Sequence, residues 1–163
     1  MGSPWESHTS RRVLPTSAIT LTPVANVSGT STITVTVTDA GGVSTTGSFV
    51  LTVTAVNDAP TITAISDQTT PEDTATGAIA FSVGAVSSAA GSLTVTATSS
   101  NVGVVAAGGI ALGGSGADRT ITLSPVANAS GTSTITVTVT DAGGASATSS
   151  FVLTVSDVND APT

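Results

Sequence analysis

Apolar and polar residues alternate strictly along several short segments of the chain. In the segment 32–39 (TITVTVTD), Ile33, Val35 and Val37 fall on one side and threonines on the other. The segment 48–53 (SFVLTV) has the same two-residue period. This is the period of a half-buried β-strand, and threonine favours the pleated backbone. Both segments are therefore predicted to be strands, connected through the turn-forming sequence DAGG.

This pattern occurs twice. Residues 19–61 align with residues 121–163 without a gap, and 36 of the 43 positions are identical. Each copy also has a short predicted strand at its start, which is ITL at 19–21 in the first copy. The intervening residues, 62–120, occur only once. Turn-forming Gly and Ser clusters divide them, and four strands are predicted near 60–66, 78–83, 93–98 and 109–112.

The offset between the copies is 102 residues, which is the size of one small β-sandwich domain. Residues 62–163 hold seven predicted strands, as expected for an immunoglobulin-like Greek-key sandwich. No stretch shows the spacing of an amphipathic helix. We therefore predict an all-β chain with a complete Ig-like or cadherin-like sandwich at 62–163. Residues 19–61, with three predicted strands, are an incomplete half-repeat that precedes it.

Residues 1–18 differ in composition from the rest of the chain. They contain its only tryptophan and histidine, Trp5 and His8, and two of its three arginines, Arg11 and Arg12. They lack the apolar region of a signal peptide. We interpret them as a non-repeat leader, either introduced by cloning or the ragged start of a longer protein.

The alternation also predicts the core. The apolar faces of the two sheets are expected to meet around Phe81, Phe151, Ile135 and Val137. Phe49 falls on an inward strand position as well, so all three phenylalanines are predicted to be core residues and not platforms for a sugar ligand.

The net charge of −7 limits the kinds of partner that the chain is expected to bind. Binding to nucleic acid needs a basic face, and a chain with three arginines and no lysine does not provide one. No apolar run approaches the roughly 20 residues of a membrane-spanning helix, so no membrane insertion is expected. An acidic surface suits a protein that works in salt water or binds calcium, although solubility alone explains it equally well.

The segments FVLTVTAVNDAPTIT (49–63) and FVLTVSDVNDAPT (151–163) resemble the ends of bacterial cadherin-like or Ig-like tandem repeats. Such repeats occur in large secreted adhesins and other giant surface proteins. The resemblance covers roughly residues 19–163. It implies an extracellular or cell-surface array in which each domain extends reach or contacts a protein or carbohydrate surface.

In cadherins, calcium clamps successive domains, so the resemblance also implies calcium ligands. The second linker matches the cadherin linker motif through Asp157, Asn159 and Asp160, and PED supplies Glu72. ADRT matches a second cadherin motif through Asp118. The implied set at the far end of the sandwich is Glu72, Asp118, Asp157, Asn159 and Asp160, and a weaker set at the junction is Asn57, Asp58 and Asp141.

The match to the calcium motifs is incomplete. Ala55 replaces the leading acid of the first linker, and Thr120 replaces the glutamate that should follow Arg119. The loop GAVSSAAGS lacks the paired aspartates of cadherins. The alternative is that these acids and asparagines cap turns and keep the strand ends soluble.

The half-repeat is expected to need a partner, because three strands with an uncovered apolar face are poorly stable alone. A strand of six or seven residues spans about 20 Å. The Asn-Asp-Ala-Pro connection spans at most about 14 Å, too short to return the first copy into the domain that follows it. The second copy is therefore predicted to complete the sandwich. Residues 19–61 would then be disordered, pair with the same segment of another chain, or swap into a neighbouring molecule, and we expect self-association through 19–61.

The residues do not favour an enzyme. Serine-type catalysis needs a base beside the nucleophile, and the only histidine, His8, lies outside the repeats. A carboxylate pair for glycoside cleavage is conceivable from Glu72, Asp73 or Asp118, but aromatic sugar platforms are lacking. We therefore predict a structural or adhesive module. The alternatives are a carbohydrate-binding module and, behind it, a hydrolase.

Overall fold

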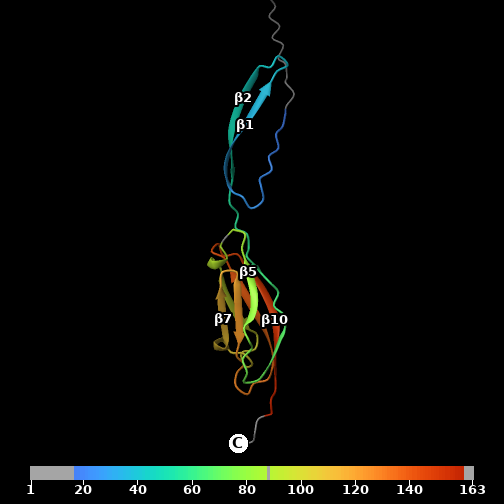
Figure 1. Ribbon diagram of the computed structural model, residues 1–163, viewed down its shortest axis with the longest axis vertical. Helices are drawn as coiled ribbons and strands as arrows, with labels where there is room; N and C mark the ends of the chain where they lie inside the picture. The colour runs from blue at the N-terminus through green and yellow to red at the C-terminus, as the bar shows by residue number, and fades with distance from the viewer. Residues whose placement is uncertain (1–16, 88, 160–163) are drawn as a thin grey trace, which may run out of the picture.

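The computed structural model describes residues 17–87 and 89–159 (Figure 1). Two 3₁₀ turns, η1 (Ala90–Ser92) and η2 (Ala107–Gly109), are its helical elements, and over the described residues no helix is long and apolar enough to cross a membrane. The strands are β1 (Gly29–Thr38), β2 (Ser44–Val53), β3 (Thr61–Ile62), β4 (Gln68–Pro71), β5 (Ile79–Gly84), β6 (Thr94–Ser99), β7 (Ile110–Ser115), β8 (Asp118–Leu123), β9 (Gly131–Thr140) and β10 (Ser146–Ser156).

Strands β3 to β10 form a two-sheet sandwich. One sheet has the order β4-β10-β9-β6 and the other the order β3-β5-β8-β7. Strand β4 pairs with β10 in parallel, and the other strand pairs are antiparallel. The repeated segment supplies β9 and β10, at the centre of the first sheet, and the second half of β8. The predicted all-β Greek-key sandwich is therefore confirmed.

The core lies between the sheets and follows from the alternation in sequence. Ile135 and Val137 of β9 are fully buried, and Phe151 of β10 and Phe81 of β5 are almost so. These are the four residues around which the core was predicted. The remaining buried apolar residues are Ile65, Val83, Leu93, Val104, Val105, Ile121, Leu123, Val139, Leu153 and Val155.

The strand predicted near 60–66 is reduced to β3, and the chain after it crosses to the other sheet. Thr61 pairs with Gly84 of β5, whereas the chain beyond residue 67 pairs with β10 as β4. At the crossing, Ile65 is buried and its N–H donates to Ser149 Oγ at 3.3 Å. The sequence did not predict β4, because QTTP has no apolar alternation. With β4 included, the sandwich has eight strands, β3 to β10, where seven were predicted.

The half-repeat forms only the hairpin β1–β2, which projects beyond one end of the sandwich (Figure 1). Its register, with Ile33 opposite Phe49, is the register of β9–β10, with Ile135 opposite Phe151. The third strand expected at 19–21 is absent. In the second copy the same three letters lie in β8, between β5 and β7, and the half-repeat has no counterparts of these two strands.

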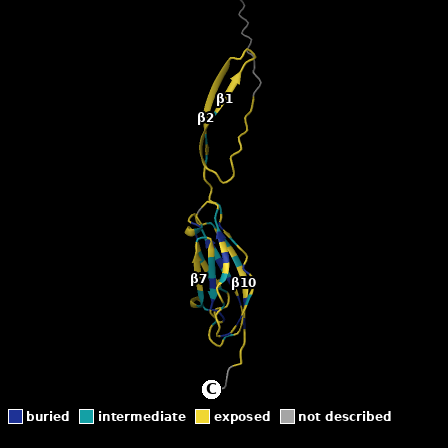
Figure 2. Cartoon of the chain, in the orientation of Figure 1, coloured by how far each residue is buried: buried dark blue, intermediate teal, exposed yellow. Residues whose placement is uncertain are grey.

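Phe49 also departs from the prediction. Its side chain is 44 % exposed, whereas its counterpart Phe151 is 2 % exposed. Figure 2 shows the contrast along the whole hairpin, which is almost entirely exposed, while the sandwich has a buried interior. The alternation correctly placed Phe49 on the apolar face, but no second sheet of the described residues covers that face in the hairpin.

Candidate functional site

The linker between β2 and β3 is bound to two loops at the end of the sandwich. The Asn57 side chain donates from Nδ2 to Asp141 Oδ2 at 2.9 Å. Its amide oxygen accepts a hydrogen bond from Ser87 Oγ at 3.2 Å. Asp141 lies in the turn between β9 and β10, and Ser87 lies in the loop after β5. One asparagine therefore connects the end of the half-repeat to both loops.

Hydrogen bonds within the turn 141–145 hold the Asp141 carboxylate in position for this contact. Its Oδ1 accepts the N–H of Ala145 at 2.9 Å, and its main chain exchanges hydrogen bonds with Ala145 and Gly144. Gly144 has a φ of 86°, which glycine adopts without strain. Asp141 itself is buried, with 6 % of its surface exposed. One carboxylate oxygen thus closes the turn, and the other receives the linker.

Gly143 provides the space in which the Asn57 amide lies. A Cβ atom at this position would collide with the amide, with the Asn57 Cγ only 2.6 Å away. At the equivalent Gly41 of the first copy, a Cβ would meet only the Asp39 carboxylate, at 3.3 Å. Sequence reasoning missed this role of Gly143. The available signal was that the DAGG turn and the VNDAP linker recur together in both copies.

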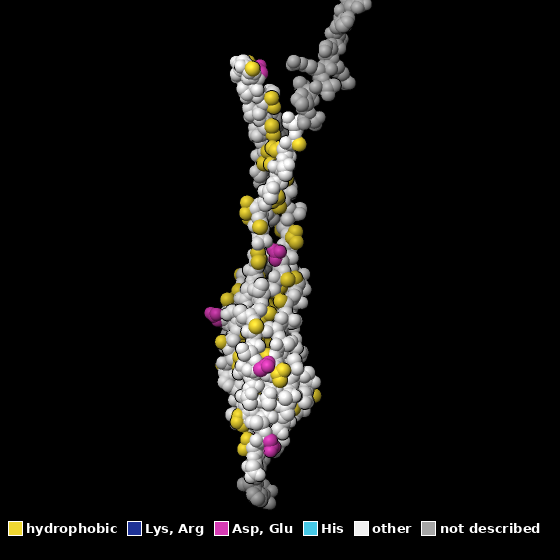
Figure 3. All heavy atoms as spheres, turned by 90° about the vertical axis from the view of Figure 1, so that its right-hand side faces the viewer, with side chains coloured by type: hydrophobic (Ala, Val, Ile, Leu, Met, Phe, Trp, Pro, Cys, Tyr) yellow, Lys and Arg dark blue, Asp and Glu magenta, His cyan; other side chains and the backbone are white. Residues whose placement is uncertain are grey.

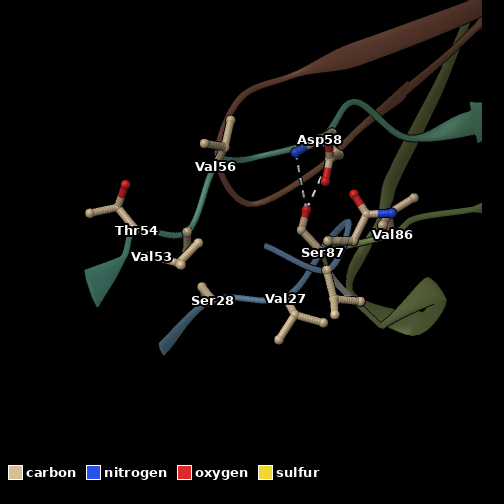
Figure 4. A pocket seen from close by; sticks show the side chains of 11 residues that line it. Val27, Ser28, Val53, Thr54, Val56, Asp58, Val86 and Ser87 are labelled. Atoms are coloured by element: carbon tan, nitrogen blue, oxygen red, sulfur yellow. Dashed lines mark hydrogen bonds between the residues drawn. The ribbon is translucent and has the colours of Figure 1, made fainter. Parts of the chain in front are cut away.

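The rest of the linker is anchored beside this contact. The Ser87 hydroxyl lies 3.4 Å from both the N and the O of Asp58, and Pro60 is buried. Figure 4 shows Ser87 and Asp58 at a pocket of about 270 Å³ between the hairpin and the sandwich. Its apolar lining comes from both sides, with Val53 and Val56 on the hairpin side and Val86 on the sandwich side.

The weaker of the two predicted calcium sets lies at this junction. The structure brings Asn57 and Asp141 into direct contact, and Asp58 is the next residue of the linker. However, both carboxylate oxygens of Asp141 accept protein N–H groups. Calcium requires six to eight oxygen ligands, several of them from carboxylates. The arrangement is that of a hydrogen-bonded joint and does not fit a calcium cage.

The other predicted set is only partly assembled. Glu72 is buried and its Oε1 accepts the N–H of Val158 at 2.7 Å, which places it beside Asp157 and Asn159. Asp160 lies outside the described residues. In the described ranges 17–87 and 89–159, no group of three or more His, Cys, Asp or Glu side chains is placed to hold a metal ion.

Asp118 does not join this set, because it lies near the opposite end of the sandwich. It pairs with Ser82, two residues before Gly84, which pairs with Thr61 beside the junction. The end of β8 that approaches Glu72 is about 17 Å away, at five residues of 3.3 Å each. Asp118 matches the cadherin motif in sequence, but in this structure it is the first residue of β8, at the end away from Glu72. Calcium binding by the complete chain stays a prediction.

Residues 57–161 match the family model described as a bacterial Ig domain. No curated protein matches the chain significantly. Among solved structures, the protocadherin gammaB7 EC3-6 cis-dimer has a TM-score of 0.52 and 22 % identity, covering 81 % of this chain and 32 % of that one. Titin domains z1z2 in complex with telethonin give a TM-score of 0.51 and 17 % identity, covering 81 % of this chain and 62 % of that one.

At these identities the structural likeness concerns the fold alone. The chain spans about a third of the protocadherin chain and under two thirds of the titin chain. The family model covers the sandwich and the linker that ties it to the hairpin. The chain therefore belongs to the family of bacterial Ig domains.

Proposed function

We propose that the chain is a structural module of a repetitive bacterial surface or secreted protein. In this role, Ig-like sandwiches follow one another end to end and hold an adhesive region away from the cell. The observation that carries the proposal is the bond between Asn57 and Asp141, which ties the end of one repeat to a turn of the next.

Each copy of the repeat carries both partners of this joint. The linker asparagine is Asn57 in the first copy and Asn159 in the second, and the turn aspartate is Asp39 or Asp141. The end of any such repeat is therefore able to dock on the turn of the repeat that follows. A joint encoded in the repeating unit allows an array of any length to be built from one kind of contact.

The joint also limits bending. Proline has a fixed φ, and the buried Pro60 leaves the linker few free torsions before β3 begins. The side-chain bonds of Asn57 and Ser87 then fix the preceding residues to the sandwich. A short, anchored linker of this kind transmits direction from one domain to the next, which is what an extending module requires.

The proposed role is extracellular and not enzymatic. Among the described residues, the acids are spread over separate turns and strand ends and do not converge on a pocket. Calcium is not needed for the joint at Asn57. If calcium contributes, its place is the C-terminal end, where Glu72, Asp157 and Asn159 lie in neighbouring segments.

Distance measurements between spin labels test the joint. The chain has no cysteine, so Thr36→Cys in β1 and Thr148→Cys in β10 give two unique, exposed labelling sites. With the labelled chain diluted in unlabelled chain, so that the measured distance lies within one chain, we expect a narrow distribution that broadens in Asn57→Ala and does not depend on calcium. Asp39→Ala is the matched control, because it removes the same turn contacts in the first copy, where no described linker residue contacts the turn. A distribution that is broad in the unmutated chain, or that narrows only when calcium is added, contradicts the proposal.

A further inference from the structure

The hairpin carries an apolar face that the other described residues, 17–87 and 89–159, leave largely uncovered. We call it the hairpin face, and its residues are Ile33, Val35, Val37, Phe49, Leu51 and Val53. Val37 is 63 % exposed and Val35 is 37 % exposed, and Phe49 is exposed as well. Figure 3 shows hydrophobic side chains along the projecting hairpin. Contiguous apolar surface of this kind marks an interaction site.

The second copy shows what this face needs. In β9–β10 the counterparts of these six residues are at most 2 % exposed, because the sheet containing β5 and β8 packs over them. In the hairpin, the segment 17–28 is the part of the described chain that lies beside the face. Its Leu21 and Val24 line a groove of about 380 Å³ with Leu51 and other residues at the linker end. Within the described part of the chain, the outer half of the face, with Val37 and Phe49, is exposed.

Exchange of strands between chains does not solve this problem. Every chain has one single-copy half, 62–120, and its own β9–β10 already fills it. If β1–β2 of one chain replaced β9–β10 of another, an equal apolar face would be released. The replacement would also be poorer, because Ser149 Oγ accepts the Ile65 N–H and the equivalent Gly47 has no side chain. Exchange therefore buries no additional apolar surface.

A second hairpin face is the complementary surface that each additional chain brings. We propose that the hairpin face packs on the hairpin face of a second copy of this chain, in a two-fold dimer. The two two-stranded sheets would then lie about 10 Å apart, as stacked sheets do. A two-fold axis places the same patch on both sides of the contact, so one apolar face is sufficient for both partners.

The charge of the hairpin agrees with this partner. Neither β1 nor β2 contains a charged residue, and the only charge between Gly29 and Val53 is Asp39 in the turn. Two copies of a chain with a net charge of −7 repel one another over most of their surface. The hairpin face itself bears no charge, so it allows close approach of two copies.

Sedimentation and light scattering on the full chain test the dimer. We expect a mass of twice 15.6 kDa that falls to 15.6 kDa in Val37→Asp. Val50→Asp is the matched control, because Val50 lies on the opposite face of β2 and is 64 % exposed. We expect it to keep the dimer. Both variants should retain the melting transition of the sandwich, which neither residue contacts.

Cysteine cross-linking and partner exchange complete the test. Under mild oxidation, Val35→Cys should form a disulfide-linked dimer and Val50→Cys should not. Dimers held by face packing should exchange partners within minutes on mixing. A monomer at millimolar concentration, equal loss of the dimer in Val37→Asp and Val50→Asp, or partner exchange only at the rate of global unfolding would overturn the proposal, the last in favour of strand exchange.

Discussion

Asn57 donates a hydrogen bond to Asp141 across 84 positions of the chain, and this contact connects the half-repeat to the sandwich. It depends on a turn that is present in both copies and on a linker that is present in both copies. The same turn forms at Asp39, where Oδ1 accepts the N–H groups of Gly41 and Val43, and no linker contacts it among the described residues. The structure therefore shows the turn once in the joint and once outside it.

Gly143→Ala should loosen the joint without unfolding the sandwich. The new Cβ displaces the Asn57 amide, so we expect the loss of about one net hydrogen bond, about 0.5–1.5 kcal/mol. Amide exchange at Ser87 and the spin-label distances measure this. Gly41→Ala is the control, because there the Cβ meets only the Asp39 carboxylate. Equal effects of the two substitutions would show that the change acts on the turn and not on the joint.

The two copies separate what local sequence decides from what tertiary context decides. Asn26 and Asn128 share a left-handed backbone, with φ of 60° and 52°, and Gly42 and Gly144 share φ values of 87° and 86°. These turns form with or without a surrounding sandwich. They are therefore predictable from a short stretch of sequence, as were the alternating strands.

Other features were not predictable because they depend on distant partners. The letters ITL form a strand at 121–123 and none at 19–21, because only the second copy lies between β5 and β7. The contact of Asn57 with Asp141 needs two loops to meet in space. Asp118 was assigned to the wrong end of the sandwich, because a match to a short motif does not show at which end of a strand the matched residue lies.

Substituting the equivalent phenylalanines should give very different results. Phe151→Ala removes a buried side chain and should cost the sandwich about 3–5 kcal/mol. Phe49→Ala should leave the unfolding free energy of the sandwich unchanged, since no second sheet covers Phe49. Urea denaturation measures both. A comparable loss in Phe49→Ala would mean that the hairpin face packs against the sandwich of its own chain.

Ser149→Gly should show why the second copy completes the sandwich. It leaves the Ile65 N–H without an acceptor in a part-buried position, at a cost of about 1–3 kcal/mol, to which glycine in a strand adds about 0.5–1 kcal/mol. Ser150→Gly is the control, since it carries the same strand penalty but loses only a solvent-exposed hydrogen bond between its hydroxyl and that of Thr136. Equal losses of unfolding free energy in the two variants would remove the role of the Ser149 hydroxyl.

Glu72→Ala tests whether the Glu72 carboxylate stabilises the fold as a hydrogen-bond acceptor or as a ligand of calcium. The Oε1 atom accepts the N–H of Val158 at 2.7 Å in a buried position, so its removal should cost about 1–3 kcal/mol. Because the acceptor acts directly on the main chain, we expect the same loss in chelator and in millimolar calcium. A ligand that binds only the folded chain raises its stability with concentration. If the loss appeared only in calcium, the carboxylate would act through the ion, and the calcium site implied at this end by Asp157 and Asn159 would gain direct support.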